Sequence, residues 1–407
     1  MLSYGETLDY LYSRLPVFQH IGKAAYKADL NNTLALCAAL GNPEKAFKSI
    51  HVGGTNGKGS VSSMLSAIFT RHGLKTGLYT SPHLKDFRER IRINGEMISE
   101  AFVVNFTEKV KPLIESIEPS FFEITVAMAF EYFRAEKVDI AIVEVGMGGR
   151  LDSTNVITPE LAVVTNIGWD HMDFLGDTLP KIAAEKAGII KPEIPVVIGE
   201  SSPETRPVFL HKAESHHSPI YFAEAAPDEW IEACELKGNY QRKNLATIKK
   251  ATEVLKTLGY ALENEVILKA LKSITLLTGL RGRWEVLQTQ PLTIADTAHN
   301  SDGLRETMSQ LRKLKAPKIH FVLGVVNDKD LSKILPLLPV DADYYFCKPN
   351  IFRGLNAEKL AEQARNAGLR GKVFESVEKA KNMAKSLAGE DDVIYIGGST
   401  FVVAEAL

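Results

Sequence analysis

The chain reads His51-Val52-Gly53-Gly54-Thr55-Asn56-Gly57-Lys58-Gly59-Ser60 between a run with strand character and a run with helical periodicity. Glycines let backbone N–H groups converge on phosphate oxygens, a helix N-terminus adds positive potential, and Lys58 adds a full charge. The segment is therefore predicted to be a nucleotide-phosphate loop. The strict P-loop spacing fails, because Val52 stands where a glycine is required and Gly59 follows the lysine. A glycine-rich turn that only connects a strand to a helix is the alternative.

The segments that flank this loop alternate between short β-rich runs and longer runs of helical period. Such alternation is typical of βαβ units and a mostly parallel sheet. Residues 61–69 place apolar side chains at helical spacing, and Gly73 is expected to end that helix. Asn94-Gly95 within 90–99 predicts an inserted hairpin. The strands expected in this half are 49–52, 76–79, 138–145, 161–165 and 195–198.

The same alternation restarts near residue 292, after a segment at 279–283 that contains glycine and arginine and has no periodicity. This segment is the expected linker. A chain of 407 residues exceeds the usual size of one hydrophobic core. We therefore expect an α/β protein with a P-loop-type, mostly parallel sheet flanked by helices in 1–283 and a smaller Rossmann-like α/β domain in 284–407. The strands expected in the second half are 292–295, 319–325, 344–347, 373–375 and 393–396, with a helix at 357–367.

The composition excludes several classes of protein. Hydrophobic residues make up 45% and charged residues 24%, as in ordinary globular proteins. With 48 basic and 50 acidic side chains interspersed, no basic face for nucleic acid is expected. The three cysteines show no CxxC spacing, which argues against a disulfide framework and a zinc site. The first residues lack a signal-peptide pattern and no long apolar run occurs, so we expect a cytoplasmic protein without a membrane partner.

Further motifs along nearly the whole chain share one resemblance. They are Thr80-Ser81-Pro82-His83-Leu84, Glu144-Val145-Gly146-Met147-Gly148-Gly149-Arg150-Leu151-Asp152-Ser153-Thr154-Asn155, Gly168-Trp169-Asp170-His171, Glu185-Lys186-Ala187-Gly188-Ile189 and Asp296-Thr297-Ala298-His299-Asn300. With the loop, they resemble the folylpolyglutamate synthase/dihydrofolate synthase family, which belongs with the Mur ligases. The resemblance implies an ATP- and Mg²⁺-dependent ligase that activates a folate-type carboxylate as an acyl phosphate and joins it to L-glutamate.

The resemblance also implies which residues bind ATP. They are Gly54, Thr55, Asn56, Gly57, Lys58, Gly59, Ser60, Asn244, Arg283 and Asp296. Lys58 would also act in catalysis, and His299 would lie beside the ATP contacts as a further catalytic residue. Arginine suits this task because its forked donors match phosphate geometry.

The chain departs from the family in the second half. It has Arg281-Gly282-Arg283 where Pro-Gly-Arg is usual, and Thr297 where glycine is usual. Arg283 keeps the family's spacing to Asp296, so it is the arginine expected to face ATP. Arg281 is expected to be a solvated linker charge.

Glu144 stands at the carboxyl end of the most apolar strand, where ligands bind in open α/β sheets. A carboxylate that only caps the next turn is the alternative. By resemblance, Ser81, Glu144 and His171 would hold Mg²⁺, with two ions possible. Because Mg²⁺ prefers oxygen ligands, His171 is the least expected of the three, and a hydrogen-bonded loop histidine is its alternative.

Lys186 would ordinarily be interpreted as a solvated surface lysine. The resemblance implies instead that CO₂ carbamylates it, which turns a cation into an anion able to assist metal binding. This reaction needs the neutral amine, so it requires a lowered pKa.

Six residues match the positions that contact the pterin-bearing substrate in bifunctional relatives: Phe121, Phe122, Glu123, Leu151, Asp152 and Ser153. Aromatic rings can stack on a pterin, although both phenylalanines could equally lie in a helix core. The choice between dihydropteroate and reduced folate as carboxyl donor stays open. A monomer is the expected oligomeric state.

Three other functions fit parts of the pattern. A Mur-type cell-wall ligase would need a UDP-sugar pocket, usually on an extra N-terminal domain, and only about 45 residues precede the first strand. A non-enzymatic nucleotide-dependent switch would not need glutamate for ATP turnover. A small-molecule kinase would release a phosphorylated product instead of free phosphate.

Overall fold

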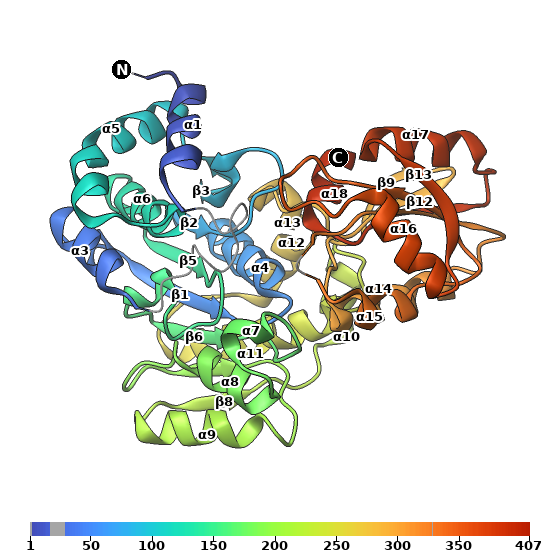
Figure 1. The fold of residues 1–407 in the computed structure, drawn as a ribbon. Helices are drawn as coiled ribbons and strands as arrows, with labels where there is room; N and C mark the ends of the chain where they lie inside the picture. The colour runs from blue at the N-terminus through green and yellow to red at the C-terminus, as the bar shows by residue number, and fades with distance from the viewer. Residues whose placement is uncertain (1, 17–28, 328) are drawn as a thin grey trace. The chain divides into compact units, whose positions relative to one another are not determined.

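The computed structural model describes residues 2–16, 29–327 and 329–407. They form two compact units, shown in Figure 1 with the second in orange to red. Unit 1 comprises Met1–Glu235 and Arg242–Leu280, and unit 2 comprises Leu236–Gln241 and Arg281–Leu407. The expected linker at 279–283 therefore contains the boundary between Leu280 of unit 1 and Arg281 of unit 2. The short segment Leu236–Gln241 also belongs to unit 2.

Unit 1 is built on a sheet with the order β4-β3-β2-β5-β1-β6-β7-β8. The strands from β2 to β8 in this order are parallel, whereas the β3–β4 hairpin runs antiparallel on the edge next to β2. The bounds are β1 (Lys48–Gly53), β2 (Thr76–Tyr79), β3 (Ile91–Ile93), β4 (Glu96–Met97), β5 (Ile140–Glu144), β6 (Leu161–Val164), β7 (Val196–Ile198) and β8 (Ile220–Phe222).

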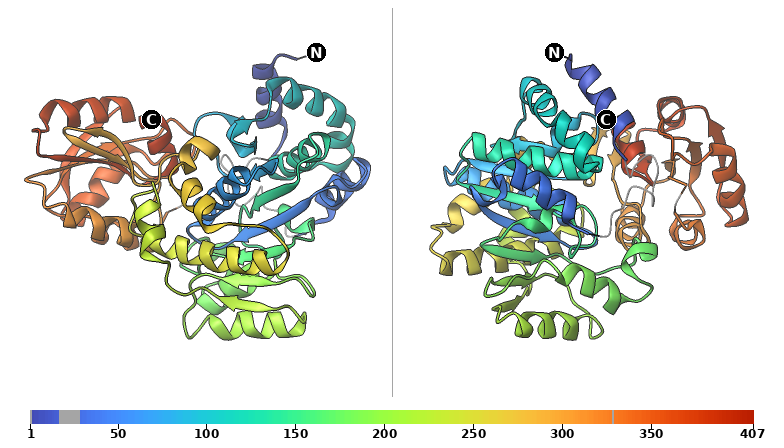
Figure 2. Two further views of the ribbon diagram at one scale, coloured as in Figure 1. Left: turned by 180° about the vertical axis from the view of Figure 1, so that it is seen from behind. Right: turned by 60° about the vertical axis from the view of Figure 1, so that its left-hand side comes forward.

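Helices lie on both sides of this sheet, as the two views in Figure 2 show. On one side, α1, α3, α5 and α6 share a core with Tyr79 of β2 and with Ala141 and Val143 of β5. On the other side, α4 contacts β1, β2 and β5. Strand β5 is buried along its whole length because both of its faces are covered.

The helices of unit 1 begin and end at the following residues. They are α1 (Tyr4–Arg14), α3 (Asn31–Ala39), α4 (Lys58–Arg71), α5 (Glu100–Ile117), α6 (Phe121–Ala135), α7 (Met172–Leu175), α8 (Leu179–Ala187), α9 (Arg206–Ser215), α10 (Asp228–Ala233), α11 (Gln241–Thr257, which starts in unit 2), α12 (Asn264–Leu271) and α13 (Ile274–Thr278), with 3₁₀ turns η2 (Pro43–Lys45), η3 (Phe87–Arg90) and η4 (Ser153–Val156).

Unit 2 has a sheet with the order β13-β12-β11-β14-β10-β9, parallel except for β9. Helices α14, α15 and α16 cover one face, and α17 and α18 cover the other. This is a doubly wound, Rossmann-like arrangement, so the predicted fold class is confirmed for both units. The elements are β9 (Glu285–Thr289), β10 (Leu292–Ala295), α14 (Ser301–Lys313), β11 (Ile319–Leu323), α15 (Leu331–Ile334), η5 (Leu335–Leu337), β12 (Asp343–Cys347), α16 (Ala357–Asn366), β13 (Arg370–Phe374), α17 (Val377–Leu387), β14 (Val393–Gly397) and α18 (Thr400–Ala406).

The differences from the sequence-based prediction concern edge strands. Strands β8 and β9 were missed, and β13 begins three residues before the predicted 373–375. All three lie at a sheet edge, and their side chains are only partly buried or exposed. Without burial of a face, the apolar alternation that marks a strand is absent.

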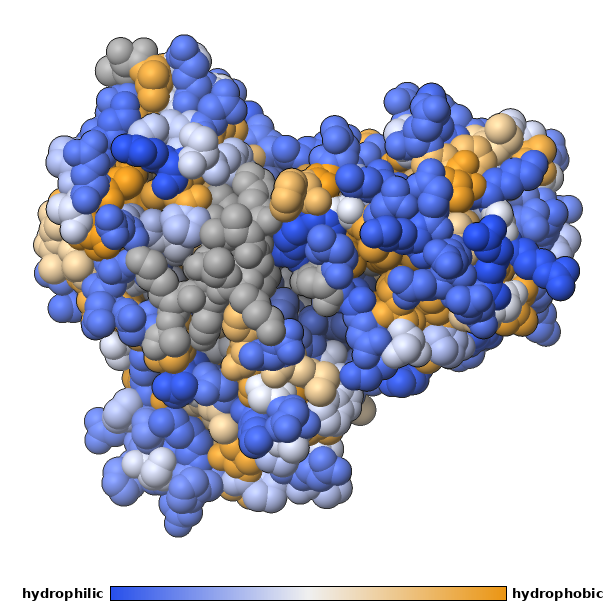
Figure 3. Space-filling model, in the orientation of Figure 1, coloured by the Kyte–Doolittle hydropathy of each residue, from blue (hydrophilic) through white to orange (hydrophobic). Residues whose placement is uncertain are grey.

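Hydrophilic residues cover most of the molecular face in Figure 3, and the hydrophobic residues on that face form separate spots. Among the described residues, the large apolar side chains with the highest exposed fractions are Leu276 (84%) and Phe352 (82%). Within the described ranges, no helix combines the length and apolar character that a bilayer crossing requires.

The cores of the two units predict separate responses to a core mutation. Leu360 of α16 is buried in the core of unit 2, so Leu360→Ala is expected to lower its free energy of unfolding by about 2–5 kcal/mol. Hydrogen exchange followed by mass spectrometry should show lost protection in β11 and β14 and unchanged protection in β5. Exposed Glu362 on the same helix provides the control Glu362→Ala. Equal losses in both units would contradict separate cores.

Candidate active site

The glycine-rich loop between β1 and α4 fits closely against its neighbours. A Cβ atom at Gly54 would lie 1.9 Å from Thr165 Oγ1, and one at Gly57 would lie 2.3 Å from Asn244 Oδ1. Both glycines also have positive φ angles, which favour glycine on backbone grounds. The structure thus brings the predicted loop and the predicted ATP contact Asn244 together.

The end of β6 fixes the loop backbone. The N–H of Thr55 donates to the Asn166 carbonyl at 3.0 Å, and the N–H of Asn56 donates to Asn166 Oδ1 at 2.8 Å. Thr165 Oγ1 donates to the Asn56 carbonyl at 2.6 Å. Sequence analysis did not single out Thr165 or Asn166 as functional residues. Their place at the carboxyl end of a predicted parallel strand was the available signal.

The loop presents donors suited to phosphate. Helix α4 begins at Lys58, and the amides in the first turn of a helix have no intrahelical acceptor. The helix N-terminus and the Lys58 ammonium group add positive potential, and Lys58 Nζ donates to the Thr55 carbonyl at 3.1 Å. Gly59 and Ser60 occupy this first turn, so the predicted loop residues form one continuous cradle.

Ser81 and Glu144 meet at the carboxyl ends of the adjacent strands β2 and β5. The N–H of Ser81 donates to Glu144 Oε2 at 3.1 Å, and Glu144 is only 4% exposed. His171 lies just before α7, and its N–H donates to Asp170 Oδ1 at 3.0 Å. The structure therefore brings two of the three predicted metal ligands together, and His171 stays a prediction.

The donor set fits a hard divalent cation only in part. Among the described residues, no group of three or more His, Cys, Asp or Glu side chains is arranged to hold a metal ion. The buried Glu144 carboxylate is an oxygen ligand of the kind that Mg²⁺ prefers. Mg²⁺ usually keeps several waters and binds through one or two carboxylates together with substrate phosphates, and Glu144 would supply one such carboxylate.

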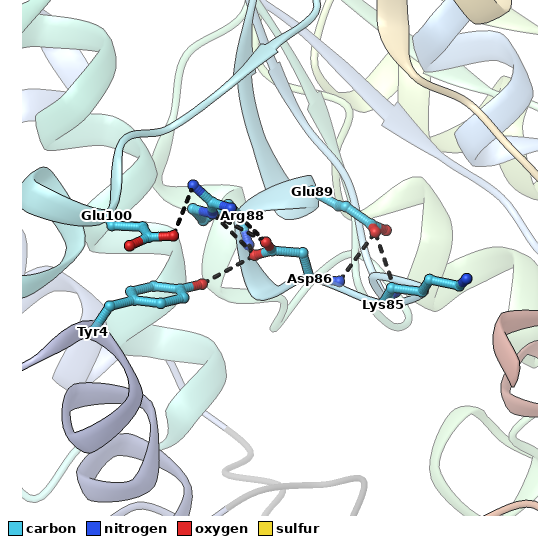
Figure 4. A network of polar contacts seen from close by, with 6 residues as sticks. All are labelled: Tyr4, Lys85, Asp86, Arg88, Glu89 and Glu100. Atoms are coloured by element: carbon cyan, nitrogen blue, oxygen red, sulfur yellow. Dashed lines mark hydrogen bonds and ion pairs between the residues drawn. The ribbon is translucent and has the colours of Figure 1, made fainter.

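The loop that carries Ser81 is held by a polar network (Figure 4). The Glu89 carboxylate accepts from the N–H groups of Leu84, Lys85 and Asp86 at 2.8–3.1 Å. Hydrogen bonds from Arg88 lower the pKa of Asp86 to about 2, and Tyr4 Oη also donates to this carboxylate. These contacts give the segment between β2 and β3 a defined conformation.

Lys186 of α8 is buried, with 4% exposure, so its interpretation as a solvated surface lysine is wrong. Its Nζ atom donates to the Gly54 carbonyl of the phosphate loop at 3.0 Å. Burial, and then the nearby charge of Lys58, lower the pKa of Lys186 to about 7, although Asp170 and Asp152 act in the opposite direction. An appreciable fraction of the amine is therefore neutral near pH 7.

Asp152 organises the turn after β5. Its carboxylate accepts from the N–H of Met147 at 2.8 Å and from the N–H and hydroxyl of Thr154, and burial raises its pKa. The Thr154 hydroxyl also contacts His51 Nε2 at 2.8 Å. Burial lowers the pKa of His51 to about 3. Leu151 and Ser153 flank Asp152 in this turn.

The three consecutive residues at the start of α6 have different surroundings. Phe122 lies against the turn after β5, because a Cβ atom at Gly146 would be 2.4 Å from its Cζ atom. Phe121 is buried and stacks on Tyr12 with ring centroids 5.0 Å apart. Glu123 caps α6, since its carboxylate accepts from the Ser120 N–H at 2.6 Å. Only Phe122 of these three is placed beside Asp152.

In unit 2, Asp296 lies at the carboxyl end of β10 and is buried. Its Oδ2 atom accepts from Tyr240 Oη and from the Trp284 N–H, both at 2.7 Å, and its Oδ1 atom accepts from the Ala298 N–H at 2.8 Å. Burial raises the pKa of Asp296. Tyr240 was not predicted, and its position 56 residues before Asp296 left no local signal.

Arg283 and His299 both contact Thr297. Arg283 Nη1 donates to Thr297 Oγ1 and to the Gly282 carbonyl, the latter at 3.3 Å. His299 Nδ1 lies 3.0 Å from the Thr297 carbonyl and donates to it. Arg281 is exposed and pairs with Glu285, which agrees with its interpretation as a linker charge.

Two regions of the chain match domains of the Mur ligases. Residues 52–261 match the Mur ligase middle domain, and residues 282–400 match the Mur ligase glutamate ligase domain. The chain is 33% identical over 435 residues to the dihydrofolate synthase/folylpolyglutamate synthase of Bacillus subtilis, covering 99% of this chain and 98% of that protein.

Two solved structures are similar over the full length. The folylpolyglutamate synthase of Mycobacterium tuberculosis, complexed with ADP, has a TM-score of 0.87 and 30% identity, covering 99% of this chain and 97% of that one. The bifunctional folylpolyglutamate synthase/dihydrofolate synthase of Yersinia pestis, complexed with AMPPNP and Mn ion, has a TM-score of 0.83 and 28% identity, covering 100% and 97%. This chain belongs to the folylpolyglutamate synthase/dihydrofolate synthase family of Mur ligases.

Proposed function

We propose that the chain is an ATP- and Mg²⁺-dependent ligase that forms an amide between L-glutamate and the carboxylate of a folate-type substrate. The observation that carries this proposal is the convergence of Lys58, buried Lys186 and Asn244 on one phosphate loop. The names and bound nucleotides of the relatives support the same reaction.

In the proposed reaction, a substrate carboxylate oxygen attacks the γ-phosphorus of ATP, and the bond to the β-phosphate bridging oxygen breaks to release ADP. The glutamate amine then attacks the acyl carbon, inorganic phosphate leaves, and the amine proton is lost to solvent. No protein nucleophile is needed. Lys58 and the amides of the loop would hold the phosphates, and Arg283, Asp296 and His299 are proposed to contribute from unit 2. Catalysis would rest on positioning and charge neutralisation.

The proposed metal ligands are Ser81, Glu144 and His171. These residues would hold Mg²⁺, which would supply positive charge to offset the negative charge that develops on the phosphates. Support comes from the buried Glu144 carboxylate and its contact with the Ser81 backbone. Asp170 accepts from the backbone N–H of His171, and its Oδ2 atom lies 3.8 Å from His171 Nε2.

We also propose that Lys186 is carbamylated. The neutral amine would attack CO₂, forming an N–C bond and releasing one proton. A pKa of about 7 and a position against the Gly54 carbonyl support this modification. The carbamate would place an anion beside the loop, where a cation bound to the phosphates could balance it.

For the pterin-bearing substrate, the positions of Phe122 and Asp152 give the most support, because Phe122 of α6 packs against the turn after β5 that contains Asp152. Leu151 and Ser153 flank Asp152, and Phe121 and Glu123 are the remaining proposed contacts. Both dihydropteroate and reduced folates are proposed as carboxyl donors. A monomer in the cytoplasm stays a prediction from the sequence.

The overall reaction predicts phosphate release from ATP that depends on glutamate. Purified chain with ATP and Mg²⁺ should release phosphate when dihydropteroate or tetrahydrofolate is supplied with glutamate, and only at a background rate without glutamate. Turnover with both acceptors would establish two activities, and turnover with tetrahydrofolate alone would restrict the enzyme to polyglutamylation. Silence with both acceptors, despite ATP binding, would contradict the proposed substrates.

The carbamate predicts a spectroscopic signal. In ¹³C-bicarbonate buffer near pH 8, wild-type protein should show a bound carbamate resonance, and Lys186→Ala should lose it. Lys191→Ala is the matched control, since Lys191 is also partly buried with a lowered pKa and donates to the Asn155 carbonyl at 2.7 Å. A resonance that survives in Lys186→Ala would place the modification elsewhere.

Glu144→Gln is expected to weaken Mn²⁺ binding in the presence of AMPPNP by about 10-fold or more, because it removes the buried anionic ligand. Electron paramagnetic resonance of free Mn²⁺ measures this affinity. Glu123→Gln serves as the control, since glutamine also suits the capping position, the Glu123 carboxylate accepts from Ser120 and Asn32, and no pterin-bearing substrate is present in this assay. Unchanged Mn²⁺ affinity in Glu144→Gln would refute the ligand assignment.

A further inference from the structure

Thr297 lies beside two proposed ATP contacts, Arg283 and Asp296, and the proposed function gives this residue no role. It follows Asp296 at the carboxyl end of β10 and is buried. Its N–H donates to the Gly282 carbonyl at 3.1 Å, which joins the strand end to the segment that carries Arg283. The backbone connection would exist with any residue at 297, so the side chain needs a separate explanation.

The Thr297 hydroxyl has a defined hydrogen-bond direction. It donates its single proton to the Gly282 carbonyl at 3.1 Å, so its lone pairs are available as acceptors. Arg283 Nη1 donates to this oxygen and also to the Gly282 carbonyl. Both protons on Nη1 are thereby engaged, and the guanidinium plane is held by two acceptors instead of one.

The remaining edge of the guanidinium group is suited to an anion. With Nη1 engaged, the Nε and Nη2 protons form the pair that matches two phosphate oxygens. Among the described residues, Arg283 donates to no carboxylate. The buried carboxylate of Asp296 accepts instead from Tyr240, Trp284 and Ala298. The arginine is therefore oriented without being neutralised by a direct ion pair.

We propose that Thr297 is a positioning residue that orients Arg283, with its Nε and Nη2 edge directed at an anionic phosphate of the nucleotide. This inference rests on the proposed role of Arg283 as an ATP contact.

Calorimetric titration of the full chain with ADP and with AMPPNP tests the proposal. Thr297→Val keeps the side-chain shape and the backbone bonds but removes the hydroxyl, so it should weaken AMPPNP affinity by about 10-fold or more, as expected for one hydrogen bond to a charged group. Thr297→Ser keeps the hydroxyl and should stay within about 2-fold of wild type. Thermal unfolding checks that each variant is folded.

A double-mutant cycle separates orientation of Arg283 from a general structural effect. In an Arg283→Ala background, Thr297→Val should cause no further loss of AMPPNP affinity. An equal loss with and without Arg283, or a loss in Thr297→Ser as large as in Thr297→Val, would overturn the proposal. If Thr297→Val binds AMPPNP as tightly as wild type while Arg283→Ala binds it weakly, the positioning role of Thr297 is overturned and the role of Arg283 in ATP binding stands. Wild-type affinity in Arg283→Ala would overturn the role of Arg283 in ATP binding and the positioning role with it.

Discussion

The backbone of the phosphate loop in unit 1 is packed so closely that no side chain fits at Gly54 or Gly57. Thr165 and Asn244 occupy the space that Cβ atoms would need, and Asn166 engages the two N–H groups that follow Gly54. Because β1 and β6 are adjacent parallel strands, the carboxyl end of β6 brings Thr165 and Asn166 to the loop, whereas Asn244 comes from helix α11. The sheet register therefore determines the shape of the cradle, and the other site residues of unit 1 are placed around it.

The electrostatics of this loop follow from the same packing. Lys58 and Lys186 donate to consecutive carbonyls, of Thr55 and Gly54, and Lys186 is almost completely removed from water. Burial is the main cause of the lowered pKa of Lys186, and the charge of Lys58 is the second. A polyphosphate bound to the loop would reverse this balance by adding negative charge. Conversion of Lys186 to an anion would then require a further cation, which agrees with a metal-dependent reaction.

Much of the fold could be predicted because its signals are local. Glycines at 53–59, the apolar run of β5 and the helical spacing after Lys58 each follow from short-range constraints. The edge strands β8, β9 and β13 lack a buried face and were missed or displaced. The cap of α6 by Glu123 was readable, since Ser120 and Glu123 form the capping-box pattern.

Burial and long-range pairing limited what could be predicted about the site. The burial of Lys186 depends on the packing of α8 against the phosphate loop. Lys186 donates to the carbonyl of Gly54, which lies 132 positions earlier in the sequence. Tyr240 donates to Asp296, although helices α11, α12 and α13 lie between the two residues in the sequence. No composition or periodicity signal marks either contact. Resemblance pointed to Lys186 and Asp296, whereas physical reasoning on the sequence alone favoured a surface position for Lys186.

The surroundings of Arg283 show how a structural role and a binding role can belong to the same short motif. Asp296 accepts from the N–H of Trp284, the residue after Arg283, and Thr297 donates to the carbonyl of Gly282, the residue before it. The strand end at 296–297 thus fixes the backbone on both sides of the arginine. The buried Asp296 carboxylate accepts three hydrogen bonds from Tyr240, Trp284 and Ala298. These contacts help to set the backbone from which Arg283 extends, so that loss of Asp296 would displace the arginine as well as remove a charge.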